Sequence, residues 1–213
     1  MKSPSDLQEK IALLMALAET DHDGPSRVMK PLPPRLRNAR RAGTLGPINI
    51  RSLRTGRGPT SLLRILMTNA CSLNCHYCPM RRDRAMPRVL LKPDELVRIF
   101  LGATSRGWCE GLFITTGIPA RPVKVMDDLI QVLELLRERH RFRGYIHTKI
   151  VPGADSAQVE RLTALASRVS INLEAPCGDH LARIAPEKVL STTLTNLEQA
   201  RAVILHARGT AAD

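Results

Sequence analysis

The run Thr68-Asn-Ala-Cys-Ser-Leu-Asn-Cys-His-Tyr-Cys-Pro79 places three cysteines, Cys71, Cys75 and Cys78, within eight residues. A C-x3-C-x2-C loop can wrap three thiolates around three corners of a cuboidal iron–sulfur cluster, which leaves the fourth iron without a cysteine. Ferredoxins that only carry electrons use four cysteines for each cluster, and structural zinc sites close with four ligands. The spacing therefore predicts a [4Fe-4S] cluster with one open iron, at which chemistry takes place.

This loop and its surroundings resemble the radical S-adenosylmethionine (radical SAM) enzymes, which share the cysteine spacing and an aromatic residue, here Tyr77, before the third cysteine. The chain is similar to one branch, assigned to DNA modification or repair and often paired with a uracil-DNA-glycosylase-like protein. The resemblance covers about residues 60–190 and is carried by Ser61-Leu-Leu-Arg-Ile-Leu-Met-Thr-Asn, Glu110-Gly-Leu-Phe-Ile-Thr-Thr-Gly, His140-Arg-Phe-Arg-Gly-Tyr-Ile-His-Thr-Lys, Pro152-Gly-Ala, Ser170-Ile-Asn-Leu-Glu-Ala-Pro and Leu181-Ala-Arg-Ile-Ala-Pro-Glu-Lys.

The resemblance implies a [4Fe-4S] cluster and SAM as cofactors, and reductive cleavage of SAM to a 5′-deoxyadenosyl radical that abstracts hydrogen from the substrate. By this resemblance, the three cysteines of the loop are the cluster ligands. It assigns a catalytic role to no other side chain. Because the usual Gly-Gly-Glu is absent after the second strand, the backbone there is expected to hold the amino group of SAM. The residues expected to contact SAM are Tyr77, Thr115, Thr116, Gly117, Lys149, Asn172 and Glu174.

Past residue 60, short apolar runs alternate with amphipathic segments, which predicts a parallel sheet crossed by helices. Asp155 and Gln158 are spaced as the capping box of one helix. We therefore predict an α/β fold, a partial TIM-type barrel with about four of the six β/α units of the radical SAM core. The expected strands are 62–68, 111–116, 144–150 and 168–174, and the expected helices are 93–103, 125–140, 155–167 and 195–208.

The last two expected strands alternate polar and apolar side chains. The apolar set must face the helices, so the polar set is predicted to point into an open, ligand-holding interior, because the pattern recurs in two neighbouring strands. Strand ends that reach solvent are the alternative. The polar set comprises Tyr145, His147, Lys149, Ser170, Asn172 and Glu174.

The uneven distribution of charged residues along the chain predicts how the chain is divided into domains. Between Gly24 and Arg82 there are 12 Lys or Arg and no Asp or Glu, whereas the rest holds 20 basic and 20 acidic residues, so this stretch accounts for the net charge of +12. We expect an amphipathic helix at 1–20, an extended, unpacked Pro/Gly-rich basic arm at 21–60 and the core at 61–213. The arm either contacts nucleic-acid phosphates or is a solvated linker, and charge alone does not choose.

The start of the chain lacks the apolar core of a signal peptide, and no apolar run approaches a membrane span. Five cysteines, three of them crowded together, do not form a disulfide framework. We therefore expect a cytoplasmic protein with no membrane partner, in which Cys109 and Cys177 are free thiols. Its expected partners are a flavodoxin- or ferredoxin-type reductant, nucleic acid and a uracil-DNA-glycosylase-like protein.

Two other classes remain open. A non-catalytic iron–sulfur or zinc module would use the cysteines structurally and the arm for nucleic acid, and an electron-transfer protein would need a fourth thiolate from Cys109 or Cys177. With four expected units instead of six, the chain is expected to be C-terminally shortened, with low activity or none by itself. A C-terminal partner or a second copy would then cover the open edge of the fourth strand.

Overall fold

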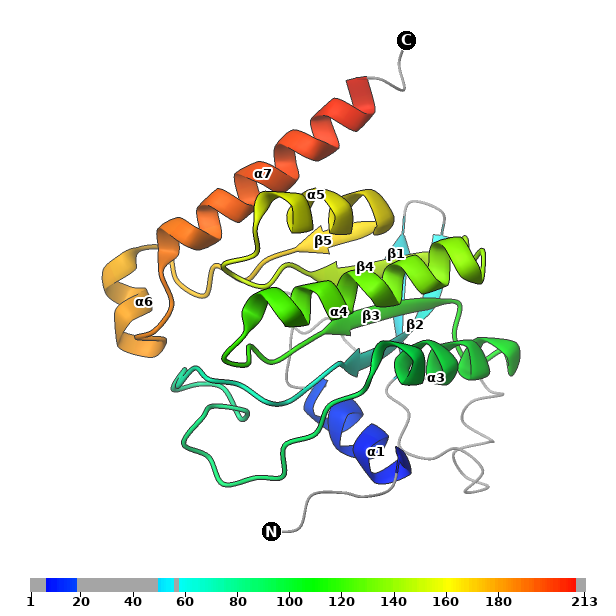
Figure 1. Cartoon of the computed structure of the whole chain (residues 1–213), viewed down its shortest axis with the longest axis horizontal. Coiled ribbons are helices and arrows are strands. Elements are labelled where there is room, and N and C mark those ends of the chain that lie inside the picture. Colours follow the sequence, from blue (N-terminus) through cyan, green and yellow to red (C-terminus); the bar gives the residue numbers. More distant parts are fainter. Residues whose placement is uncertain (1–6, 19–49, 56–57, 210–213) are drawn as a thin grey trace.

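The computed structural model describes residues 7–18, 50–55 and 58–209 of the 213-residue chain. These form an α/β fold whose elements alternate as predicted (Figure 1). The elements are α1 Leu7–Ala18, β1 Ile50–Thr55, β2 Gly58–Leu66, α3 Pro93–Ser105, β3 Gly111–Thr115, α4 Pro122–Glu134, the π-helical turn η1 Leu135–Arg139, β4 Tyr145–Lys149, α5 Ser156–Leu165, β5 Arg168–Ser170, α6 Gly178–Ile184 and α7 Leu190–Gly209.

The sheet has the strand order β1-β2-β3-β4-β5. Strands β2 to β5 are parallel, as predicted, and β1 pairs antiparallel with β2. Helices α3, α4 and α5 cover one face of the sheet (Figure 1), and α1 packs against β2. Because parallel strands all end at the same edge, the loops after β2, β3, β4 and β5 meet there.

The core lies between the sheet and these helices. Leu63, Ile65, Leu112, Ile114 and Ile146 are all fully buried and join one apolar cluster with the inner faces of α3 and α4. The predicted capping box at the start of α5 is confirmed, because the Gln158 N–H donates to Asp155 Oδ1 at 2.8 Å and the Asp155 N–H donates to Gln158 Oε1 at 3.3 Å.

Three elements differ from the prediction. The end of the expected arm is packed against the sheet. Residues 50–55 form β1, which is hydrogen-bonded along β2 and buries Ile50. The fourth expected strand is shorter, since pairing stops at Ser170 and Glu174 turns into the left-handed region with φ 64°. Helix α6 was missed, because its seven residues are too few to show a period.

The boundaries of other elements shift modestly. Helix α7 begins at Leu190, five residues before the predicted start, and the predicted helix 125–140 is divided into α4 and the π-helical turn η1. Residues 21–49 of the predicted basic arm lie outside the described residues, so the domain division stays a prediction. In the described ranges, no helix combines the length and the apolar character that crossing a membrane requires.

Candidate active site

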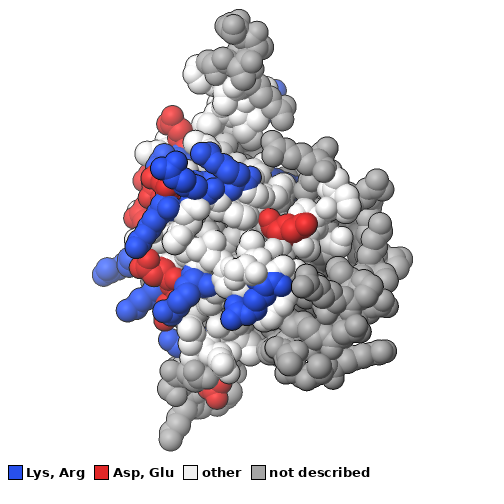
Figure 2. Space-filling view, turned by 90° about the vertical axis from the view of Figure 1, so that its right-hand side faces the viewer, with Lys and Arg blue, Asp and Glu red and all other residues white. Residues whose placement is uncertain are grey.

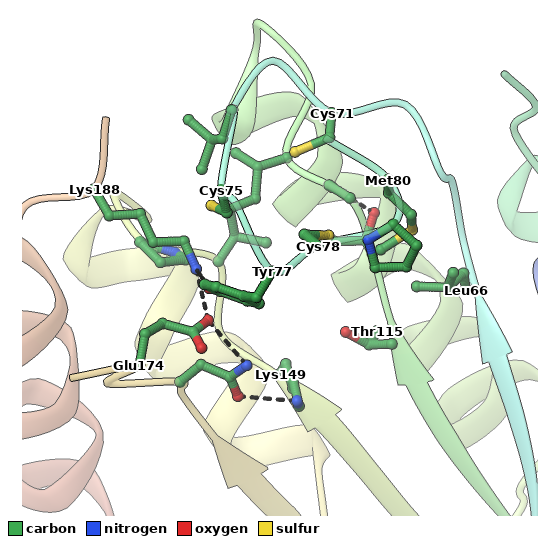
Figure 3. A pocket seen from close by; sticks show the side chains of 18 of the residues that line it. Leu66, Cys71, Cys75, Tyr77, Cys78, Met80, Thr115, Lys149, Glu174 and Lys188 are labelled. Atoms are coloured by element: carbon green, nitrogen blue, oxygen red, sulfur yellow. Dashed lines mark hydrogen bonds and ion pairs between the residues drawn. The ribbon is translucent and has the colours of Figure 1, made fainter. Parts of the chain in front are cut away.

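One cavity at the carboxyl edge of the sheet, of about 160 Å³, gathers all ten predicted cofactor residues. The three cysteines and Tyr77 come from the loop after β2, Thr115–Gly117 from the end of β3, Lys149 from the end of β4, and Asn172 and Glu174 from the segment after β5. Figure 3 shows the cysteine loop lying over the ends of these strands. The structure therefore brings these residues together around one cavity, and their roles as cofactor ligands stay predictions.

The end of β3 holds the cysteine loop through its backbone. The Gly117 N–H donates to Thr68 O at 2.7 Å, and the Ser72 N–H donates to Ile118 O at 2.7 Å. A Cβ atom built on Gly117 would lie only 2.3 Å from Ala70 O. Glycine is therefore required here for close approach of two backbones, which is the physical basis for the predicted backbone role of this segment.

Arg88 fixes the other side of the loop. Its guanidinium donates to the carbonyl oxygens of Asn69 and Met80, both at 2.7 Å, and of Arg81 and Arg84, at 2.7 and 3.1 Å. A planar guanidinium with five N–H donors can hold several carbonyls at once, which an ammonium group cannot do with the same geometry. One side chain thus shapes the chain on both sides of the three cysteines.

The segment from α6 to the start of α7 closes over the loop. The His76 N–H donates to Ile184 O at 2.8 Å, and the Asn74 N–H donates to Glu187 Oε2 at 3.1 Å. Cys75, Leu181 and Ala185 are buried together in a small apolar cluster that is separate from the main core. The cysteine loop is therefore clamped by contacts more than one hundred residues distant in the chain.

A chain of polar side chains forms one wall of the cavity. Lys149 Nζ donates to Asn172 Oδ1 at 2.9 Å, and Asn172 Nδ2 donates to Glu174 Oε1 at 3.1 Å. Lys188 Nζ also donates to Glu174 Oε1, at 2.7 Å, and lies 3.4 Å from the Tyr77 hydroxyl (Figure 3). Lys188 is the charged residue of this cavity that the sequence analysis did not predict, although its segment carries part of the family resemblance.

These surroundings shift the pKa values of the cavity residues. Burial raises the pKa of the Cys75 and Cys78 thiols, and the nearby Lys188 ammonium opposes this rise. Burial and the negative charge of Glu174 raise the pKa of Tyr77, which therefore stays a neutral phenol. For Glu174, burial favours the neutral acid, but hydrogen bonding and attraction to Lys188 outweigh it and lower the pKa.

The donor set fits an iron–sulfur cluster. Three thiols line one cavity, and those of Cys71 and Cys78 are near enough to Cys75 to contribute to its raised pKa. Within the described ranges, no three His, Cys, Asp or Glu side chains converge on a point as the ligands of a single ion do; cluster thiolates instead bind separate irons. Cys109 is buried against Thr104 at 3.7 Å and Cys177 is exposed, and neither lines the cavity.

Three of the predicted interior groups, Tyr145, His147 and Ser170, do not line the cavity. His147 Nε2 lies 2.8 Å from Ser170 Oγ, and its ring packs edge-on against Phe113 at 4.7 Å. The Arg64 guanidinium lies over the Phe113 ring, with Cζ 4.2 Å from the ring centroid. On this face the polar groups of β4 and β5 thus lie beside the apolar Phe113 ring, and His147 is buried and does not line the cavity.

Comparison with known proteins gives curated relatives that are GTP 3′,8-cyclases. GTP 3′,8-cyclase 2 of Mycobacterium tuberculosis is 31% identical over 146 residues, which is 66% of this chain and 38% of that protein. GTP 3′,8-cyclase of Mycobacterium sp. (strain KMS) is 29% identical over 141 residues, or 65% of this chain and 39% of that protein. The chain thus spans about two fifths of the length of these curated relatives.

Solved structures show the same fold at low identity. Methylornithine synthase superposes with a TM-score of 0.56 at 10% identity, covering 65% of this chain and 40% of that one. The hydrogenase maturase HydG from Carboxydothermus hydrogenoformans gives 0.55 at 20% identity, covering 65% and 32%. Residues 65–208 match the family described as the Radical SAM superfamily, whose members use a [4Fe-4S] cluster and SAM. The chain belongs to the radical SAM superfamily.

Proposed function

We propose that this chain is a radical SAM enzyme whose cavity holds a [4Fe-4S] cluster on Cys71, Cys75 and Cys78 and SAM beside it. When bound and reduced, the cluster supplies the electron that cleaves a carbon–sulfur bond of SAM. The observation that carries the proposal is convergence: ten residues chosen from four separate parts of the sequence line one cavity.

Different residues of the cavity would bind different parts of SAM. Thr115–Gly117 line the cavity at the end of β3, where backbone carbonyl oxygens would accept hydrogen bonds from the amino group of SAM. Lys149 and Asn172 supply a cation and an amide for its carboxylate and ribose hydroxyls. Apolar lining from Leu66, Ile118 and Val151 limits water at the reacting atoms.

We further propose that the substrate is nucleic acid, modified or repaired in the cytoplasm. The 12 basic residues between Gly24 and Arg82, with no acid among them, support this proposal. So does a second basic surface where β4 begins: Arg139, Arg141 and Arg143 are exposed, while the neighbouring Glu134 and Glu138 are both paired with Arg161. Figure 2 shows Lys and Arg side chains on this side of the molecule, with Asp and Glu side chains among them.

The proposed partners follow from this chemistry. A flavodoxin- or ferredoxin-type protein would deliver one electron to the cluster, and a uracil-DNA-glycosylase-like protein would act on the same nucleic acid. Pull-down of each purified candidate at low and high salt tests both proposals separately. Retention of neither candidate would contradict them.

Anaerobic reconstitution with iron and sulfide, dithionite reduction and quantification of 5′-deoxyadenosine from SAM test the activity. We expect 5′-deoxyadenosine from the wild-type chain and none from Cys75→Ala, with a higher yield when DNA or RNA is added. A wild-type chain that binds a full cluster without cleaving SAM would contradict the proposal. A chain that takes up zinc and rejects iron would instead indicate a structural module.

A second candidate substrate is a free nucleotide, which is favoured by the similarity to GTP 3′,8-cyclases. The same assay separates the two candidates when GTP replaces nucleic acid. Stimulation of SAM cleavage by GTP and not by DNA or RNA would assign the cavity to a nucleotide.

A further inference from the structure

We propose that Lys188 sets the reduction potential of the cluster, and that Glu174 counteracts it. This inference rests on the proposed cluster in the cavity. It concerns a residue outside the cysteine loop to which no role has been assigned, and it makes the Lys188–Glu174 pair a control element for electron uptake.

The position of Lys188 supports this role. The residue lies in the turn between α6 and α7, and its side chain lines the same cavity as the three cysteines. Its Nζ is 3.4 Å from the hydroxyl of Tyr77, which lies in the chain between Cys75 and Cys78. Figure 3 shows the ammonium group reaching toward the cysteine loop from the α6–α7 side.

The pair is enclosed, so its charges are weakly screened. The side chains of Lys188 and Glu174 are only 11% and 14% exposed, and their Nζ and Oε1 atoms are 2.7 Å apart. Charges in such partly buried positions act on neighbours more strongly than surface charges do, because less water and salt lie between them.

The two charges do not act equally on the loop. The Lys188 ammonium lies 3.4 Å from the Tyr77 hydroxyl of the cysteine loop, whereas Glu174 Oε1 is held by two donors outside that loop, Lys188 Nζ and Asn172 Nδ2, at 2.7 and 3.1 Å. The positive end of the pair is therefore in direct contact with the loop. Reduction adds one negative charge to a cluster, and a nearby cation stabilises that reduced state, since net charge and hydrogen bonding tune cluster potentials.

A redox titration followed by electron paramagnetic resonance (EPR) of the reduced cluster, without SAM, tests the inference. We expect Lys188→Gln to shift the midpoint potential to more negative values by about 59 mV or more, which corresponds to a tenfold change in the ratio of reduced to oxidised cluster for one electron. Glu174→Gln should shift the potential in the positive direction by less. The double variant should lie between the two single variants.

Matched controls separate charge from structure. Lys188→Arg keeps the cation and should stay near the wild-type potential. Lys124→Gln removes the same charge from another Lys–carboxylate pair, with Asp128 at 3.1 Å, that is exposed and does not line the cavity, and should not change the potential. Tyr77→Phe removes the hydroxyl contact alone and should shift the potential less than Lys188→Gln.

The two single variants are expected to shift the midpoint potential in opposite directions. Either shift alone therefore tests the inference, even if the other variant does not assemble a cluster. A Lys188→Gln potential at or above that of the wild type, or a Glu174→Gln shift in the negative direction, would overturn it. Because the titration contains no SAM, absent SAM cleavage with the expected shifts would contradict only the proposed activity. A wild-type chain that binds no cluster would overturn both.

Discussion

Gly117 is the residue whose replacement should damage the site most selectively. An added Cβ would overlap the Ala70 carbonyl at 2.3 Å, so Gly117→Ala must push the end of β3 away from the cysteine loop. We expect a loss of about 1–3 kcal/mol in the free energy of unfolding, together with weaker cluster retention. Thermal denaturation and iron content measure the two effects.

Gly178 offers the matched control. A Cβ on Gly178 would have no heavy atom within 4 Å, so Gly178→Ala should leave stability and iron content at wild-type levels. Equal iron content in the two glycine variants would contradict the close-approach argument.

Glu174 should give the fold a pH dependence in the acidic range. Its pKa is lowered in the folded state, mainly because Lys188 outweighs the effect of burial. The unfolded pKa is about 4.3, so the stabilisation is complete above that value and is lost as the pH falls through the lower folded value. The difference in unfolding free energy between wild type and Glu174→Gln should be constant near pH 7 and shrink below about pH 4.3.

Chemical denaturation at a series of pH values measures this difference in the apo protein. A difference that is unchanged down to pH 3, or that grows on acidification, would contradict the assigned pairing. Asn172→Ala provides a comparison, because it removes a neutral donor to Glu174 and keeps the Lys188 pair.

Residues that belong to a local sequence pattern, such as a cysteine spacing or a polar strand end, could be predicted as site residues. The cysteine spacing identified the ligand loop, and strand-end polarity identified Lys149, Asn172 and Glu174, because parallel strands bring their ends to one edge. Lys188 was missed because it lies in no strand and its contacts with Glu174 and Tyr77 are 14 and 111 residues away in sequence. No local pattern records such a pairing.

At the scale of elements, Arg88 is one of the groups that hold the cysteine loop in place. Four carbonyl oxygens accept from this guanidinium, and replacing Arg88 with Met leaves them without that donor. Because a hydrogen bond to a charged group contributes about 1.5–3 kcal/mol, we expect a loss of about 3 kcal/mol in unfolding free energy. Hydrogen exchange in residues 69–84 should accelerate.

Arg98 on α3 serves as the control, since it is exposed and Arg98→Met should change neither quantity. Unchanged exchange in the loop of the Arg88→Met variant would show that the clamp is dispensable.

The elements that sequence reasoning misjudged share a physical cause. β1 exists because of its pairing with β2, and β5 stops early because Asn172 and Glu174 bond sideways across the cavity instead of extending the sheet. Neither outcome shows in an apolar repeat, because β1 depends on antiparallel pairing with the next strand and β5 on side-chain contacts that span 14 and 23 residues. α3 and α4, whose apolar faces repeat with the helical period, were predicted with small errors at their ends.

At the scale of the whole molecule, the proposed binding of nucleic acid by the asymmetric charge can be tested through its salt dependence. Affinity should fall steeply with salt and show little sequence preference, because phosphate contacts release counterions. Replacing Arg35, Arg37, Arg40 and Arg41 with Gln should flatten the slope of log affinity against log salt. Fluorescence anisotropy with a labelled oligonucleotide at several salt concentrations measures this slope.

Removing four exposed basic groups elsewhere controls for total charge. The variant Arg98→Gln, Arg121→Gln, Lys124→Gln and Arg201→Gln loses as much charge from other surfaces. Equal slopes for the two variants would assign the arm to a solvated linker.

The central claim is that three cysteines hold a cluster with an iron open to SAM. The most direct measurement is the EPR spectrum of the reduced, reconstituted protein before and after addition of SAM, with iron quantified. We predict about four irons per chain and a spectrum that changes with SAM. We predict cluster loss in Cys71→Ala, Cys75→Ala and Cys78→Ala, but not in Cys109→Ala or Cys177→Ala. An intact cluster in Cys75→Ala, or a wild-type spectrum indifferent to SAM, would contradict the account.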